Sequence, residues 1–254
     1  MKIKYMFIVS TLLLSSCSAV DNKIEPFAHS DVNSDETNNS STINESPNKE
    51  TNTDTTTDKN ITIEDIFDPL ILVNKENSIG SDFVPNDLQI PNIPLLSQGD
   101  IEKNYVSAKI IPDLEQLVAD AKNEGLNLYL VSGYRSYSRQ VELYDSYINQ
   151  YGTDHTELYS AKPGHSEHQT GLSLDVSSPS ANNNLEEVFA YTNEGIWLAE
   201  NAHKYGFIIR YPKGKEEITQ YAYEPWHIRF VGKEAASEIY RKNLTLEEFL
   251  EIHE

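Results

Sequence analysis

The chain reads PGHSEHQTGLSLD from residue 163 to 175 and, further along, EPWH from residue 224 to 227. These two stretches decide how the sequence is interpreted, because they bring together imidazole nitrogens and a carboxylate oxygen, the ligands that suit zinc. Gly171 lies between His168 and Asp175, where a turn can lead into a strand. His227 lies in a second expected strand, which begins after Pro225. We therefore expect His168, Asp175 and His227 to converge on one metal ion.

A catalytic zinc site differs from a structural one in its number of protein ligands. A structural site usually has four, whereas a catalytic site has about three and keeps a position open for water. Glu224 precedes His227 by three residues, and a carboxylate beside zinc can accept a proton from a bound water whose pKa has fallen to about 7. Glu224 is therefore the candidate base. His165 is an alternative ligand, since it could bind the ion as a pair with His168 and fill the open position.

Arg135 lies in SGYRS, residues 132–136, at an expected turn from a strand to a helix. A guanidinium there could bind a carboxylate through a forked pair of hydrogen bonds or stabilise an oxyanion. A surface arginine paired with an acidic residue would give the same pattern. Glu167, which stands between two histidines, is expected to be exposed rather than catalytic.

The spacing of apolar residues predicts an α+β fold with a small, largely antiparallel sheet flanked by helices. Helices are expected over residues 107–123, 136–150, 194–205, 233–242 and 245–252. Strands are expected over residues 126–132, 172–176, 207–211 and 226–231. Two sequences, DHTE at residues 154–157 and TLEE at residues 245–248, have the form of a capping box.

The first 60 residues predict an exported protein. Residues 1–16 have a basic start, a short apolar run and small residues, as in a secretory signal. LSSC at residues 14–17 resembles a bacterial lipobox, in which Cys17 would be lipidated; an ordinary signal peptide with an incidental cysteine is the alternative. Residues 17–60 are polar and predict a disordered tether, and residues 61–254 a folded domain. We expect the protein at the extracellular face of a bacterial membrane, held by its lipid alone.

The chain is acidic, with 40 Asp and Glu residues against 20 Lys and Arg residues and a formal net charge of −20. Nucleic acid is excluded as an expected partner, because phosphate binding needs a basic face. Docking by charge on an anionic lipid surface is disfavoured for the same reason. A monomer is expected.

Three motifs in this order, SGYRS, GHSEHQTGLSLD and EPWH, resemble the VanY-type D-alanyl-D-alanine carboxypeptidases, a family of zinc peptidases. The resemblance runs from about Leu70 to Phe249 and includes ILVNK at residues 71–75, which resembles the family's first strand. It implies a hedgehog/D,D-peptidase-like fold. It also implies that the bound metal is Zn²⁺ and that peptidoglycan stem peptides are the substrates.

The resemblance also implies a role for each matching residue. His168, Asp175 and His227 match the zinc ligands, Glu224 the catalytic base, and Arg135 the arginine that binds the scissile region and steadies the oxyanion.

Other matches concern substrate contacts. Gln140 and Ser166 match positions that contact the terminal D-alanine, while Tyr134 and Trp226 would line the pocket or belong to the core. Ser173 stands where relatives often have alanine, and no loss of activity is expected from it.

The activity implied is removal of the C-terminal D-alanine from stem pentapeptides, a D,D-carboxypeptidase reaction in cell-wall remodelling. Two alternatives remain open. One is an L,D-carboxypeptidase acting on tetrapeptides. The other is a non-catalytic lipoprotein that binds wall peptides and holds a structural zinc, with His165 as its fourth ligand.

Overall fold

A four-stranded antiparallel sheet, in the order β3-β4-β6-β5, forms the centre of the protein. The structure is a computed structural model and describes residues 68–253. The strands of this sheet are β3 (Tyr129–Ser132), β4 (Ser173–Ser177), β5 (Phe207–Tyr211) and β6 (Glu224–Phe230). A smaller antiparallel pair consists of β1 (Leu88–Gln89) and β2 (Val106–Ser107). The prediction of an α+β fold with a small antiparallel sheet is confirmed.

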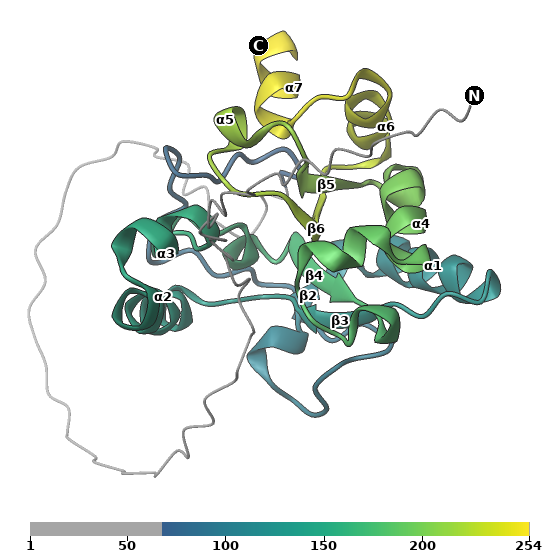
Figure 1. Cartoon of the computed structure of the whole chain (residues 1–254), viewed down its shortest axis with the longest axis horizontal. Coiled ribbons are helices and arrows are strands. Elements are labelled where there is room, and N and C mark those ends of the chain that lie inside the picture. The colour runs from purple at the N-terminus through teal and green to yellow at the C-terminus, as the bar shows by residue number, and fades with distance from the viewer. Residues whose placement is uncertain (1–67, 254) are drawn as a thin grey trace, which may run out of the picture.

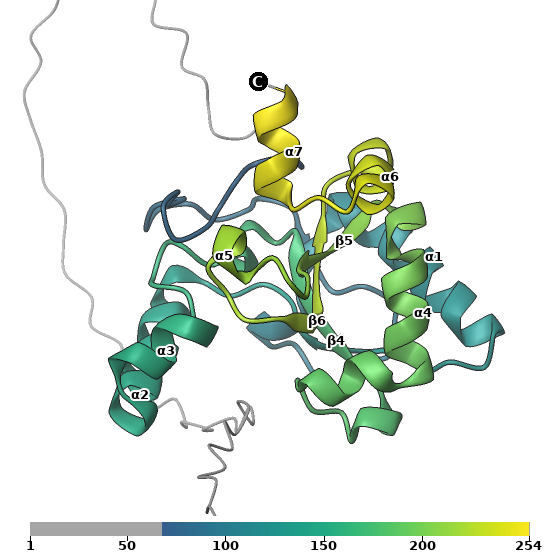
Figure 2. The same ribbon diagram turned by 45° about the horizontal axis from the view of Figure 1, so that its top comes forward.

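Helices surround this sheet, with α2 and α3 together on one side and α1 and α4 on the other (Figures 1 and 2). The α-helices are α1 (Ile111–Asn123), α2 (Tyr137–Tyr151), α3 (Thr153–Tyr159), α4 (Asn193–Asn201), α5 (Glu216–Thr219), α6 (Lys233–Lys242) and α7 (Leu246–His253). Short 3-10 helices cover Glu102–Asn104, Ala108–Ile110, Glu167–Thr170, Pro179–Ala181, Glu187–Tyr191 and Ala202–Tyr205. Each long helix expected from the apolar spacing is present.

The two faces of the sheet differ in polarity because apolar and polar residues alternate along β4 and β6. Leu174 pairs with Ile228, and both belong to the main core, which α1 and α4 cover. Asp175 pairs with His227 on the opposite face. All residues of both strands are buried. The sheet therefore presents polar side chains to an interior surface.

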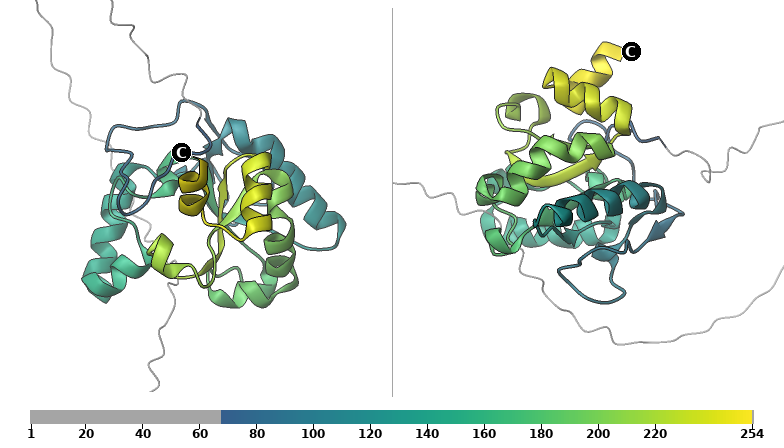
Figure 3. Two further views of the ribbon diagram at one scale, coloured as in Figure 1. Left: turned by 90° about the horizontal axis from the view of Figure 1, so that it is seen from above. Right: turned by 90° about the vertical axis from the view of Figure 1, so that its right-hand side faces the viewer.

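The C-terminal helices α6 and α7 lie side by side (Figure 3) and form a second apolar cluster with Ile208 and Val231. The capping box expected at the start of α7 is confirmed. The Thr245 backbone N–H donates to Glu248 Oε2 over 2.7 Å, and the Glu248 N–H donates to Thr245 Oγ1 over 3.2 Å. These two bonds satisfy two backbone N–H groups at the start of the helix that have no partner within it.

Two expectations about local structure are wrong. Residues 71–75 form no strand: residues 71–73 have no regular secondary structure, residues 74–75 belong to a bend, and the Arg229 guanidinium donates to the Ile71 carbonyl over 2.7 Å in place of a neighbouring strand. Residues 154–157 form no capping box, because α3 begins directly after Gly152 and has no side-chain cap.

The predicted signal, lipidation site and tether lie outside the described residues. Among residues 68–253, no helix combines the length and apolar character needed to cross a bilayer.

Candidate active site

Asp175 and His227 face each other across the pair of strands β4 and β6. His227 Nδ1 lies 3.1 Å from Asp175 Oδ1, and His168 Nε2 lies 3.3 Å from Asp175 Oδ2. All three side chains are buried, and their ligand atoms lie within 4.8 Å of one another. The structure therefore brings together the three residues expected to bind a metal.

The geometry and chemistry of these donors fit a zinc ion. Ligand atoms about 2.0–2.1 Å from zinc in a tetrahedron lie about 3.3 Å apart, close to the 3.1 and 3.3 Å separations found here. Asp175 Oδ1 is buried without a hydrogen-bond partner among the described residues. A bound cation would satisfy such an oxygen, which is otherwise rare in a folded interior.

His168 is positioned by the loop that follows β3. Its Nδ1 lies 2.7 Å from the Gly133 carbonyl oxygen, so Nδ1–H donates there and Nε2 is left for a metal. The 3-10 turn that carries His168 ends at Gly171, which has a φ of 69°. An added Cβ at Gly171 would come within 3.1 Å of the Ser107 backbone nitrogen, so a glycine is required at this turn.

Glu224 begins β6 and its Oε2 lies 3.8 Å from His227 Nδ1. Burial raises the pKa of Glu224 to about 8; the nearby Asp175 carboxylate adds to this rise, and His227 opposes it. A carboxyl group with a pKa near neutrality can both accept and release a proton. Its position and pKa suit a general base at this site.

Burial alone would lower the pKa of His227. The carboxylates of Asp175 and Glu167, 3.1 and 3.6 Å from the ring nitrogens, and that of Glu224 outweigh this effect and raise the pKa of His227 to about 9. For His168, burial prevails over Asp175, and its pKa lies below the ordinary value.

Arg135 lies beside the cluster and is held by two neighbours. Its Nη1 donates to Gln140 Oε1 over 3.1 Å, and its Nη2 donates to Ser132 Oγ over 3.4 Å. Gln140 is buried in turn and donates to the Ala161 carbonyl over 2.6 Å. This chain of contacts fixes the guanidinium at the edge of the site.

A cavity of about 70 Å³ that opens to solvent contains the cluster. The expected site residues that line it are Arg135, Ser166, His168, Asp175, Glu224, Trp226 and His227. Tyr134 and Gln140 are buried and do not line it. For Gln140, the position suits support of Arg135 better than direct contact with a substrate.

His165 does not belong to the metal cluster among the described residues. Its Nδ1 lies 2.8 Å from the Asn74 carbonyl oxygen, and its side chain lines a neighbouring recess with Lys75 and Lys162. The structure therefore brings three donors to the site and leaves His165 apart from them.

Glu167 is the clearest error of the sequence interpretation. It was expected to be exposed, but only 1% of its surface is accessible. Its Oε1 accepts hydrogen bonds from Arg210 Nε over 2.7 Å and from Arg229 Nη1 over 2.6 Å. Burial alone would raise the pKa of Glu167, but the two guanidinium groups outweigh it and hold the pKa well below the usual value.

Arg210 and Arg229 were not singled out from the sequence. A signal was present for Arg229, because alternation along β6 puts it on the same face as His227. Ser173, the cross-strand partner of Arg229, donates to Glu167 Oε2 over 3.0 Å. These residues make a polar layer directly behind the metal cluster.

Comparison with known proteins identifies the family to which the chain is similar. A family model described as VanY, D-alanyl-D-alanine carboxypeptidase, matches residues 103–233. A protein of Bacillus subtilis (strain 168) named putative carboxypeptidase YodJ is 46% identical over 190 residues, which are 75% of this chain and 70% of that protein. A D-alanyl-D-alanine carboxypeptidase of Enterococcus faecalis (strain ATCC 700802 / V583) is 36% identical, over 71% of this chain and 65% of its own length.

Solved structures of carboxypeptidases are also similar to this chain. The LdcB LD-carboxypeptidase aligns with a TM-score of 0.68 and 47% identity, covering 71% of this chain and 84% of that chain. A mutant of the D,D-pentapeptidase VanY in complex with Zn(II) aligns with a TM-score of 0.59 and 36% identity, covering 72% of this chain and 98% of that chain. The motifs, the fold and these relatives agree, and the chain belongs to the VanY family of D-alanyl-D-alanine carboxypeptidases.

Proposed function

We propose that this protein is a zinc-dependent D,D-carboxypeptidase that removes the terminal D-alanine from peptidoglycan stem peptides. The observation that carries the proposal is the buried set of His168, Asp175 and His227, with Glu224 and Arg135 lining the same cavity. Three donors suit a catalytic zinc with an open position better than a structural one. The D-alanyl-D-alanine carboxypeptidases among the relatives support the substrate class.

Zinc held by the three donors would activate a water molecule and polarise the peptide carbonyl. Glu224 would accept the proton of the attacking water at its carboxylate and deliver it to the leaving amine of D-alanine. Its pKa of about 8 before metal binding places both protonation states within reach near neutral pH. Arg135, held by Gln140 and Ser132, would donate hydrogen bonds to the negative charge that develops on the substrate.

Glu224→Ala tests the proposal. The variant should bind zinc, because all three donors remain, and should release D-alanine from a synthetic stem peptide at least about 10²-fold more slowly, since it lacks the base. Released alanine is measured by mass spectrometry and zinc content by atomic absorption. Wild-type protein should lose activity in a chelator and regain it with Zn²⁺. Wild-type rates in the variant, or rates that no chelator changes, would contradict the proposal.

An L,D-carboxypeptidase is the second candidate, and one observation favours it. The LdcB LD-carboxypeptidase shares more sequence with this chain, at 47% identity, than the D,D-pentapeptidase VanY does, at 36%. Both reactions release a C-terminal D-alanine, and they differ in the stereochemistry of the residue before the scissile bond. Pentapeptide and tetrapeptide stems, offered separately and at equal concentration, distinguish them. The better substrate, judged by kcat/KM, decides which reaction the protein performs.

A further inference from the structure

We propose that Glu167 is a positioning residue that directs the Nδ1 atom of His227 toward the metal by accepting a hydrogen bond from Nε2–H. This inference rests on the proposed zinc site. His227 offers Nδ1 to Asp175 at 3.1 Å, while Nε2 points away and lies 3.6 Å from Glu167 Oε2. Nε2 is buried and has no hydrogen-bond partner among residues 68–253. A shift of a few tenths of an ångström would bring the pair within the usual length of about 3.0 Å.

The two oxygens of Glu167 have different neighbours. Oε1 accepts from Arg210 Nε and Arg229 Nη1, at 2.7 and 2.6 Å. Oε2 accepts only from the Ser173 hydroxyl, at 3.0 Å, among the hydrogen bonds described for it. Because a carboxylate oxygen can accept more than one hydrogen bond, Oε2 retains room for His227. A ring nitrogen that donates a proton cannot also bind a cation, so this contact leaves Nδ1 as the ligand atom.

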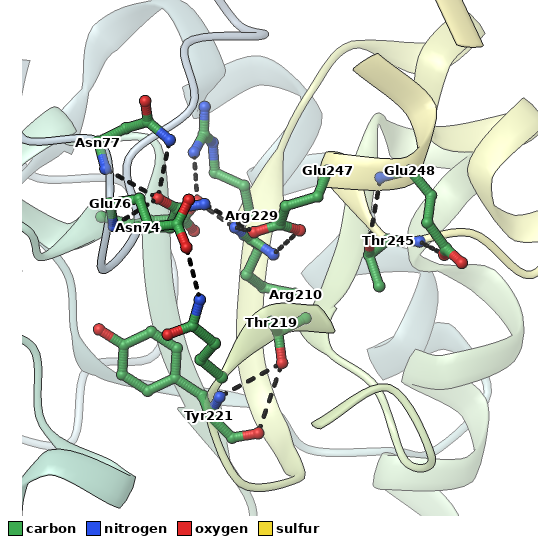
Figure 4. A network of polar contacts seen from close by, with 12 residues as sticks. Asn74, Glu76, Asn77, Arg210, Thr219, Tyr221, Arg229, Thr245, Glu247 and Glu248 are labelled. Carbon is green, nitrogen blue, oxygen red and sulfur yellow. Dashed lines mark hydrogen bonds and ion pairs between the residues drawn. The ribbon is translucent and has the colours of Figure 1, made fainter. Parts of the chain in front are cut away.

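Arg210 holds the carboxylate in this orientation and is itself held from α7. Its Nη1 and Nη2 donate to the two oxygens of Glu247 over 2.9 and 2.6 Å, as Figure 4 shows. Arg229 is fixed separately, through the carbonyls of Pro69 and Ile71. Glu167 is therefore braced by two fully buried arginines whose own contacts lie outside the metal cluster.

The substitution Glu167→Gln makes the inference testable. A glutamine amide has one oxygen and one NH₂ group. Arg210 and Arg229 both donate toward the site of Oε1, so the amide oxygen should take that place and the NH₂ group should face His227. When Nδ1 of His227 binds zinc, Nε2 carries a proton. Nε2–H and the glutamine NH₂ group, both hydrogen-bond donors, would then face each other. We expect the dissociation constant for zinc to rise about 10- to 100-fold, as for other residues that orient a metal ligand.

Glu247→Gln is the matched control. It removes a carboxylate from the same arginine but touches neither His227 nor the metal ligands. Zinc affinity is measured for wild type, Glu167→Gln and Glu247→Gln by competition with a chromogenic chelator, with circular dichroism as the check of folding. Because the glutamine oxygen can still accept from Arg210 and Arg229 still holds Glu167, Glu247→Gln should change the dissociation constant for zinc far less than Glu167→Gln does. A folded Glu167→Gln protein with the same zinc affinity as Glu247→Gln overturns the inference.

A measurement on wild-type protein decides the case even where Glu167→Gln does not fold. In ¹⁵N-labelled protein loaded with ¹¹³Cd, the ring nitrogen of His227 that couples to the metal should be Nδ1, and Nε2–H should exchange slowly with solvent. Coupling to Nε2 would overturn the inference while leaving the carboxypeptidase proposal intact. A wild-type protein that binds neither Zn²⁺ nor Cd²⁺ would overturn both.

Discussion

At the scale of single residues, the site depends on side chains that are fixed before a substrate arrives. Arg135 shows this most directly, since Gln140 and Ser132 each accept a hydrogen bond from its guanidinium. Among residues 68–253, these are the two hydrogen bonds described for the guanidinium, so its remaining N–H groups can meet negative charge in the cavity that Arg135 lines. A fixed donor needs no reorganisation during the reaction, which is the basis of electrostatic catalysis.

Arg135→Lys should therefore lower kcat/KM for stem-peptide hydrolysis about 10²- to 10³-fold while zinc content stays unchanged. Lysine keeps the positive charge but loses the planar fork, so it cannot bond to Gln140 and the substrate at once. The measurement is D-alanine release at several substrate concentrations, with metal analysis of the same sample. A change of less than about threefold would show that charge alone suffices at this position.

The proximity of His168, Asp175, His227 and Glu224 could be predicted at this scale because each lies in a short motif, and the β4–β6 register places Asp175 beside His227. Glu167 could not be predicted in the same way. Charged residues are almost never fully buried unless paired, and its partners, Arg210 and Arg229, are 43 and 62 residues away in the chain. Only the tertiary structure brings these charges together.

At the scale of elements, a helix or strand forms where it was predicted when the spacing of its own apolar residues determines how it packs. β5 covers residues 207–211 as predicted, and α7 begins at the predicted capping box. Residues 71–75 depart from prediction: the Ile71 carbonyl accepts a hydrogen bond from the Arg229 side chain instead of from a neighbouring strand. The apolar character of a segment does not show whether its backbone carbonyls will accept hydrogen bonds from another strand or from a side chain.

The ion pair between Glu247 of α7 and Arg210 of β5 holds the helix against the sheet, in addition to the contacts of its apolar face. Glu247 accepts two hydrogen bonds from Arg210, and Asn74 donates a third to its Oε1 over 3.2 Å. Burial alone would raise the pKa of Glu247, but Arg210 outweighs it and holds this pKa below its ordinary value. Both Glu247 and Asn74 lie outside residues 103–233, which the family model matches.

Glu247→Gln should lower the free energy of unfolding of the metal-free protein by about 1–3 kcal/mol at pH 7, because Arg210 loses one of its two charged partners and keeps only Glu167. The pKa of Glu247 is lowered in the folded state, so the stabilisation is fully present above the unfolded value and disappears as the pH falls through the folded value. The difference between wild type and variant should thus narrow below about pH 4.5. Urea unfolding at pH 7 and pH 3.5 checks this, and a constant difference would refute it.

At the scale of the whole molecule, the chain consists of the domain formed by residues 68–253 and the N-terminal part that precedes it. The sheet presents an apolar face to α1 and α4 and a polar face to the metal cluster, so one small sheet supports both the core and the chemistry. We propose that the N-terminal part exports this domain and that Cys17 carries a lipid anchor, on the strength of the LSSC sequence. The proposed substrate class is consistent with export, because peptidoglycan lies outside the membrane.

Cys17→Ala tests the anchor. In a bacterial host, wild-type protein should incorporate labelled fatty acid and sediment with membranes, since more than one acyl chain gives stable attachment. The variant should incorporate none and appear in the soluble or culture fraction. Its kcat/KM on a soluble stem peptide should equal that of wild type, because the metal cluster and the cavity belong to residues 68–253. Equal membrane association of the two proteins would exclude Cys17 as the anchor, and acylation of the variant would place the lipid elsewhere in the chain.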